Sequence, residues 1–105
     1  MEEQTKNPNE INIELPEEIA EGTYSNLAII SHSHSEFVLD FIRLMPNIPK
    51  AKVKSRVILT PQHAKRLLKA LSDNVNKYEG QFGTIQDPEP PQFPPISFNT
   101  PVAQA

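Results

Sequence analysis

Four short stretches of the chain carry apolar and polar residues in patterns typical of β-strands. Residues 11–15 alternate strictly, and residues 24–31 are rich in apolar side chains. Residues 36–43 place apolar side chains at every second position, and residues 52–60 do so except at Ser55. Successive side chains of a strand point to opposite faces of its sheet, so these patterns indicate sheet faces that are at least partly apolar. The proline-containing segment 45–49 is a loop, because proline cannot donate to a strand ladder. The sequence therefore predicts three to four strands.

The two faces of the stretch 36–43 differ in character. Phe37, Leu39 and Phe41 form one face, and we expect it to face the core because it is wholly apolar. The opposite face of this strand and the next one carries three apolar side chains among polar ones: Val38, Ile42 and Ile58. A second apolar patch on a small protein usually marks an interface, so these three residues are the predicted contact of an oligomer.

Residues after Thr60 have the period of an amphipathic helix. Apolar side chains recur at steps of three and four residues, at Ala64, Leu67, Leu68, Leu71, Val75 and Tyr78. Thr60 suits the N-cap, and Pro61 suits the first helical position because its missing N–H would have no partner there. Gly80 is the natural C-cap. The spacing therefore predicts a helix that ends at Gly80.

This order of strands followed by a helix predicts an α+β fold. An antiparallel meander of three to four strands, with the C-terminal helix packed on it, buries both apolar surfaces. We expect one such domain over residues 11–85. The acidic arm 1–10 and the Pro-rich tail 86–105 are expected to be disordered, and the tail favours polyproline II.

The small size of the chain argues for self-association. It has 105 residues and no cysteine, so no disulfide or Cys-ligated metal can reinforce the fold. A folding part of about 75 residues buries only about 60% of its unfolded surface and is marginal alone. We therefore expect a homo-oligomer, most simply a two-fold dimer. Without cysteines, a signal peptide or a long apolar run, the sequence favours a soluble cytoplasmic protein that does not bind membranes.

The formal net charge of −3 conceals two regions of opposite sign. Residues 1–23 hold seven glutamates and one lysine, whereas residues 41–72 hold no acid and eight cations: Arg43, Lys50, Lys52, Lys54, Arg56, Lys65, Arg66 and Lys69. A stretch of one sign attracts opposite charge, so these cations predict a surface for an acidic protein partner. Nucleic acid is the alternative partner, and it is less favoured because the whole chain is acidic and no aromatic residue alternates with the basic strand face.

Asp40 accounts for part of this basic cluster. It is the sole acid that faces the same way as Lys52, Lys54 and Arg56. In an antiparallel sheet it would lie opposite or diagonal to one of them, so a cross-strand ion pair is expected.

Catalytic and metal-binding patterns are sparse. His32, His34 and Glu36 would project from one face if this stretch were extended, which makes them a weak candidate metal site; a polar hairpin tip is the favoured interpretation. No spacing among Ser, His and Asp matches a nucleophile motif, and three glycines cannot build a phosphate-binding loop. The sequence therefore predicts a protein that is not an enzyme and has no cofactor.

Three segments together resemble the bacterial family known as domain of unknown function 3467: residues 24–41, 55–65 and 78–85. The resemblance covers about residues 11–85, and its family-typical positions are Glu36, Phe37, Asp40, Phe41, Arg56 and Pro61, to which the family attaches no role. It brings no established activity. Genes of some relatives lie beside those of the large RNA polymerase subunits, so the resemblance implies the transcription machinery as a candidate partner.

Two functions from different classes remain open at this point. The favoured one is a small non-enzymatic interaction or accessory protein that uses its basic surface to bind an acidic protein. The alternative is a nucleic-acid-binding regulator that uses the basic strand and helix faces.

Overall fold

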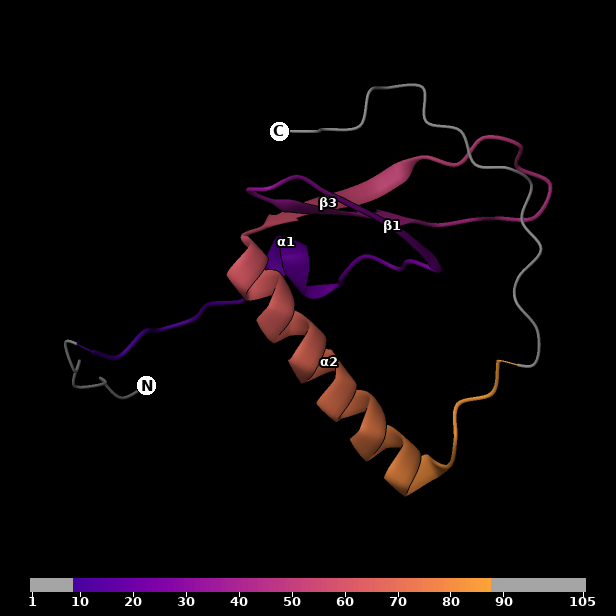
Figure 1. Ribbon diagram of the computed structural model, residues 1–105. Helices are drawn as coiled ribbons and strands as arrows, with labels where there is room; N and C mark the ends of the chain where they lie inside the picture. Colours follow the sequence, from indigo (N-terminus) through magenta and orange to yellow (C-terminus); the bar gives the residue numbers. More distant parts are fainter. Residues whose placement is uncertain (1–8, 88–105) are drawn as a thin grey trace.

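The computed structural model describes residues 9–87 as a small antiparallel sheet followed by a long helix (Figure 1). Its elements are α1 (Glu17–Ala20), β1 (Leu27–His32), β2 (Phe37–Ile42), β3 (Val53–Leu59) and α2 (Pro61–Phe82). The strands lie in the order β1-β2-β3, and both neighbouring pairs are antiparallel. This confirms the predicted α+β class, with an antiparallel meander and a C-terminal helix.

Two parts of the prediction are affected by what the structure describes. Residues 11–15, the first predicted strand, belong to no element and pair with no strand, so the described sheet has three strands. The Pro-rich tail beyond residue 87 and residues 1–8 of the acidic arm lie outside the described residues.

A tight hairpin joins β1 to β2. His32 pairs with Phe37, and the backbone N–H of Ser33 donates to the carbonyl oxygen of Glu36 at 2.9 Å. The Ser33 hydroxyl accepts from the backbone N–H groups of Ser35 and Glu36, at 3.2 and 3.3 Å. Serine in a turn makes such local bonds readily, and the predicted hairpin connection around Ser31–Ser35 is confirmed.

Side chains close the opposite end of this hairpin. The Asn26 side chain accepts from the Leu44 N–H at 2.7 Å and donates to the Leu44 carbonyl at 3.1 Å, as a backbone group would. The Ser25 hydroxyl lies 2.9 Å from the Leu27 carbonyl oxygen and 3.1 Å from that of Ile42. These bonds satisfy backbone groups beyond the last ladder pair and hold the start of β1 against the end of β2.

The pairing of β2 with β3 contains one irregularity. Phe41 pairs with Ser55, and the next residue, Ile42, pairs with Val53, so Lys54 is an extra residue on β3. Such a bulge bends its strand and increases the local twist. The loop between the two strands contains Asn47 with a φ of 64°, a left-handed conformation that asparagine tolerates.

The most buried face of the sheet is not the one that the pattern predicts. Val38, Asp40 and Ile42 are only 4, 3 and 6% exposed, whereas Phe37, Leu39 and Phe41 are partly exposed. All three lie on the central strand, where each has a paired residue on both sides: Val38, for example, lies between Ser31 and Ile58. No residue of α2 is buried, so the helix does not cover the aromatic face as the sequence predicts.

Helix α2 begins at the sheet and leaves it (Figure 1). The Thr60 hydroxyl accepts from the His63 N–H at 3.1 Å, which confirms the predicted N-cap. The helix runs for 22 residues, and none of them is buried. The expectation that its apolar side packs along the sheet is therefore wrong. It continues through the predicted C-cap Gly80 and ends before Gly83, whose φ is 98°. Within residues 9–87, no helix is both long and apolar enough to cross a bilayer.

Candidate functional site

The ion pair between Asp40 and Arg56 is the best-defined polar contact of the sheet. The two residues are direct cross-strand partners, and Arg56 Nε and Nη2 donate to the two carboxylate oxygens at 2.6 and 2.8 Å. The Asp40 side chain is 4% exposed and the Arg56 side chain 44%. This confirms the expected cross-strand pair and identifies Arg56 as its cation.

The pair has a clear electrostatic signature. Hydrogen bonds from the Arg56 guanidinium hold the pKa of Asp40 below its ordinary value, against the opposing effect of burial. The same bonds and the carboxylate charge raise the pKa of Arg56. Two parallel N–H···O bonds also fix orientation, so the pair sets the register of β2 against β3. Arg56 is therefore engaged within the chain by an acid, although its side chain still reaches solvent.

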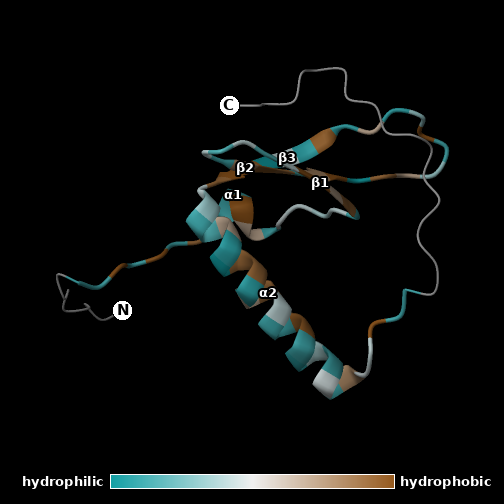
Figure 2. Ribbon diagram, viewed as in Figure 1, coloured by the Kyte–Doolittle hydropathy of each residue, from teal (hydrophilic) through white to brown (hydrophobic). Residues whose placement is uncertain are grey.

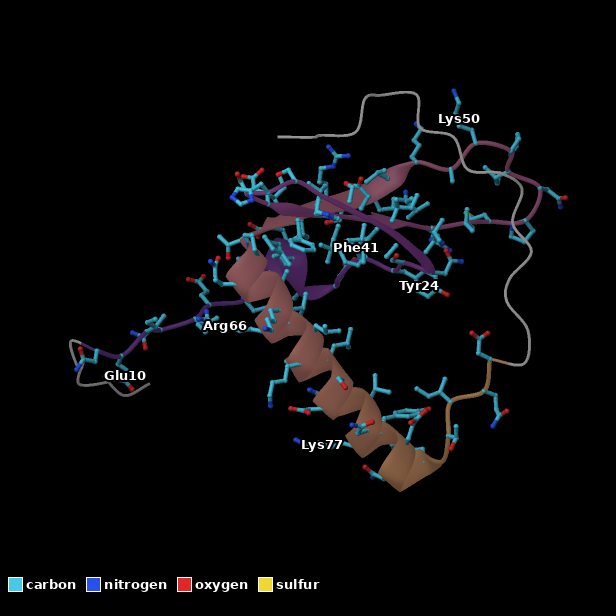
Figure 3. All side chains as sticks on the ribbon, in the orientation of Figure 1. Glu10, Tyr24, Phe41, Lys50, Arg66 and Lys77 are labelled. Carbon is cyan, nitrogen blue, oxygen red and sulfur yellow. The ribbon has the colours of Figure 1, made fainter. Side chains whose placement is uncertain are left out.

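The other predicted basic residues fall into two separate groups. The first, here called the loop group, lies at the end of the sheet where β2 leaves and β3 begins: Arg43, Lys50, Lys52 and Lys54. The second, the helix group, lies on the first half of α2: Lys65, Arg66 and Lys69. Figure 3 shows Lys50 and Arg66 in distant parts of the domain. The eight cations therefore do not make one continuous surface.

The members of these groups differ in how they are held. Arg43 places its guanidinium carbon 5.4 Å from the centre of the Tyr24 ring, a cation–π arrangement. Lys69 lies 3.8 Å from Asp73, one turn along α2. Within the part of the chain that the structure describes, Lys50, Lys52, Lys54, Lys65 and Arg66 make no ion pair. These five remain available to an acidic partner.

A shallow hollow on α2 combines the helix group with an apolar side chain. It is lined by Gln62, Lys65, Arg66, Leu68 and Lys69. Leu68 is 69% exposed, so its side chain projects between the cations and not into the domain. A hollow this open cannot exclude water from a reaction, but it can accept an apolar side chain that is flanked by carboxylates.

The residues of the weak metal candidate are not brought together. The chain turns between Ser33 and Glu36, so His32, His34 and Glu36 do not lie along one extended strand. The His32 ring stacks on Phe37 instead, with ring centres 5.3 Å apart. Among residues 9–87, no three His, Cys, Asp or Glu side chains are arranged to hold a metal ion. The geometry that the candidate required is therefore absent from this hairpin.

The predicted oligomer contact is largely internal to the chain. Val38 and Ile42 are buried within the protomer, and only Ile58, at 56% exposed, remains on the surface. Two side chains with so little exposed surface cannot form a contact with a second copy, so the structure does not support the prediction for Val38 and Ile42. It remains a prediction for Ile58.

A row of exposed apolar side chains lies on α2. Brown segments recur along the helix in Figure 2, where brown marks hydrophobic residues. The exposed members of this surface, here called the α2 stripe, are Leu67, Leu68, Leu71, Tyr78 and Phe82. The periodicity of the sequence identified most of these residues, but it assigned them to the core. A periodic pattern shows that a helix has an apolar side and does not show what covers that side.

Comparison with known proteins gives one match. A family model described as "Protein of unknown function (DUF3467)" matches residues 1–87. No curated protein and no solved structure matches the chain. The match includes the domain and the acidic arm, and it ends at residue 87, within the first residues of the segment assigned to the Pro-rich tail.

Proposed function

We propose that this chain, which belongs to the DUF3467 family, is a small non-enzymatic interaction protein that self-associates and binds an acidic protein partner. The observation that carries the proposal is α2, a well-capped helix of 22 residues with no buried side chain. Most helical stability in proteins comes from packing an amphipathic face, so a helix of this kind needs a second surface.

The two kinds of side chain on α2 support two different contacts. The α2 stripe offers apolar area for self-association, and Arg66 and Lys69 lie beside it with their charges in solvent. Opposite charge across an interface mainly sets specificity and the rate of association. The acidic protein would therefore be selected by the helix group.

RNA polymerase is the first acidic partner to test, since the resemblance implies the transcription machinery. A cytoplasmic location fits this partner and fits the absence of cysteine from the sequence. Neither the polymerase partner nor the cytoplasmic location depends on self-association of the chain.

The experiment is capture of partners from native lysate on the tagged protein, followed by direct binding to purified RNA polymerase. The informative variant is the double change Arg66→Glu and Lys69→Glu, and its matched control is Lys50→Glu with Lys52→Glu in the loop group. We expect the helix-group change to abolish capture and the control to retain it. A stoichiometric partner that binds both variants equally would show that the helix group is not the contact.

The alternative is a nucleic-acid-binding regulator, and the loop group is the observation that favours it. Four cations at one end of the sheet could contact phosphates: Arg43, Lys50, Lys52 and Lys54. Four phosphate contacts on duplex DNA would give a log K slope near −3.6 against log salt, at about −0.9 per contact. Fluorescence anisotropy with duplex and single-stranded probes tests this, and no binding at micromolar protein in low salt would end it.

A further inference from the structure

The α2 stripe has the spacing of a helix–helix seam. Four members of the stripe together with the half-buried Ala64 and Val75 follow steps of four, three, four, three and four residues, at Ala64, Leu68, Leu71, Val75, Tyr78 and Phe82. Leu67, the fifth member, lies on the flank of this row. A repeat that averages 3.5 residues is the period of helices that pair along their length, with these residues at positions a and d. A helix that packs on a sheet needs no such regular seam, so the spacing points to another helix as the occupant.

We propose that α2 pairs with α2 of a second copy of this chain, antiparallel, about a two-fold axis beside Ser72. This deepens the self-association in the proposed function and rests on it. A two-fold axis at the middle of the seam, level with residue 73, places core residues whose numbers sum to 146 opposite each other, and on the flank it places residues whose numbers sum to 144 opposite each other. The three layers on each side of that axis are then Ala64 with Phe82, Leu68 with Tyr78, and Leu71 with Val75 of the partner.

The sizes of these side chains suit the antiparallel order. Ala64, the smallest side chain of the seam, meets Phe82, one of its two aromatic residues. Leu68 meets Tyr78, and the central Leu71 meets the smaller Val75. Alternation of large and small residues across facing positions fills space evenly. A parallel pair would instead set Phe82 against Phe82 at one end and Ala64 against Ala64 at the other.

The charges beside the seam favour the same order. Lys65, Ser72 and Glu79 lie one residue after the d positions, along one flank of the stripe. In the antiparallel pair Lys65 meets Glu79 of the partner, and Ser72 meets its own copy. Glu79 Oε2 accepts from the Ile85 N–H at 2.9 Å, which leaves Oε1 for the partner's lysine. The two-fold axis repeats this ion pair, so the complementary charges occur twice.

The remaining cations stay outside the seam. Arg66, Lys69 and Lys77 lie outside positions a, d and e of this repeat, so a second helix on the seam does not cover them. Figure 3 shows Arg66 and Lys77 projecting from the same side of α2. A paired α2 therefore keeps Arg66 exposed on both copies, and Lys69 beside it still reaches solvent although it lies 3.8 Å from Asp73. The dimer would present these two members of the helix group twice, which strengthens binding to a partner that has two acidic sites, whereas Lys65 is engaged in the seam.

The first test is charge reversal at the flanks of the seam, measured by sedimentation equilibrium. Lys65→Glu alone and Glu79→Lys alone each replace two attractive pairs by two repulsive ones, and should weaken the dimer about tenfold. The double variant Lys65→Glu with Glu79→Lys should restore the wild-type association. Equal weakening in the singles and the double would overturn the antiparallel pairing.

The second test reports geometry and does not depend on affinity. The natural chain has no cysteine, so single substitutions are informative under oxidising conditions or with a short thiol cross-linker. Ser72→Cys should form a covalent dimer, because its two copies flank the axis. Tyr78→Cys should not, because its copies lie about 15 Å apart along the axis, at 1.5 Å per residue, beyond disulfide reach. Cross-linking of Tyr78→Cys alone would indicate a parallel pair and overturn the proposal.

The third test separates this inference from the proposed function. Leu71→Glu should give a monomer, whereas Lys77→Glu, outside the seam, should leave the dimer intact. A wild-type monomer at about 100 μM, where a specific interface of ordinary size should be occupied, would overturn both self-association and the α2 pair. A wild-type dimer that tolerates Leu71→Glu and does not cross-link at Ser72→Cys would overturn the α2 pair alone.

Discussion

The sheet and helix α2 both satisfy the hydrogen bonds of their backbones, but they bury their side chains to very different degrees. Strand β2 is hydrogen-bonded on both sides, and its buried face holds Val38, Asp40 and Ile42. Helix α2 has a good N-cap and makes its own backbone bonds, yet none of its residues is buried. Local signals are thus sufficient to form a helix, whereas burial of its apolar side requires a second surface. In this protein the buried residues lie in the sheet, whereas the apolar side of the helix still lacks the surface that would bury it.

The difference has a consequence for stability. Only two apolar side chains in the described chain are buried, and no side chain of any kind is fully enclosed. A protein of this size is marginal alone, and burial of the α2 stripe in a dimer would add what the sheet does not provide. We therefore expect the stability of the protein to depend on its concentration.

The largest expected effect comes from the buried face of the sheet. Ile42→Ala should lower the free energy of unfolding by about 2–5 kcal/mol, because a buried Ile is removed from a core with few members. Leu68→Ala is the matched control on the exposed stripe, and it should reduce only the concentration-dependent part of the stability. Urea denaturation at two protein concentrations measures both. Equal, concentration-independent losses would contradict the contrast between sheet and helix.

The ion pair should show the next largest effect, and it should be asymmetric. Arg56→Met leaves the Asp40 carboxylate 4% exposed and without its cation, whereas Asp40→Asn leaves Arg56 able to reach water. An uncompensated buried charge is more costly than an unpaired exposed one, so the arginine change should lower the urea midpoint further. The reverse order of the two midpoints would show that Arg56 stabilises the sheet by a route other than its carboxylate partner.

The two regions were predictable to different degrees because they are specified differently. The period of two in the strands fixes which side chains share a face, so the pairing of Asp40 with a cation of the next strand was foreseeable. The same period does not say which face is covered, so Val38 and Ile42 were assigned to the wrong environment. Residues 11–15 alternate like a strand, yet a strand needs a hydrogen-bonding partner, and that partner is not encoded locally.

The candidate site was predictable in its chemistry and not in its layout. Charge counting identified all eight cations, but their division into the loop group and the helix group depends on α2 leaving the sheet. The spacing at His32, His34 and Glu36 suggested a metal only under the assumption of an extended chain. The Ser33 bonds that turn the hairpin cancel that assumption, because they reverse the strand direction within the motif.

A pH titration sharpens the account of the ion pair. The folded pKa of Asp40 is lowered, so its contribution to stability is fully present above the unfolded value of about 3.9 and is lost as the pH falls through the folded pKa. In Arg56→Met burial alone acts on this carboxyl and raises its pKa. The stability difference between the wild type and this variant should therefore shrink as the pH falls toward about 4. A difference that is constant from pH 7 to pH 4 would show that the carboxylate is not the source of the loss.

The smallest effect that we expect tests where α2 ends. Gly80 lies inside the helix, and a Cβ built there meets nothing within 4 Å, whereas Gly83 has a φ of 98°. Gly80→Ala should therefore stabilise the protein by about 0.5–1 kcal/mol, because alanine loses less conformational freedom in a helix than glycine. Gly83→Ala should destabilise it, because the side chain is strained at this φ although space is available. Thermal unfolding of the two variants at one concentration gives the comparison. If Gly80→Ala were the destabilising change, the helix would end at Gly80 as the sequence alone predicts, and the outer turn that brings Phe82 opposite Ala64 of the partner would be lost from the α2 pair.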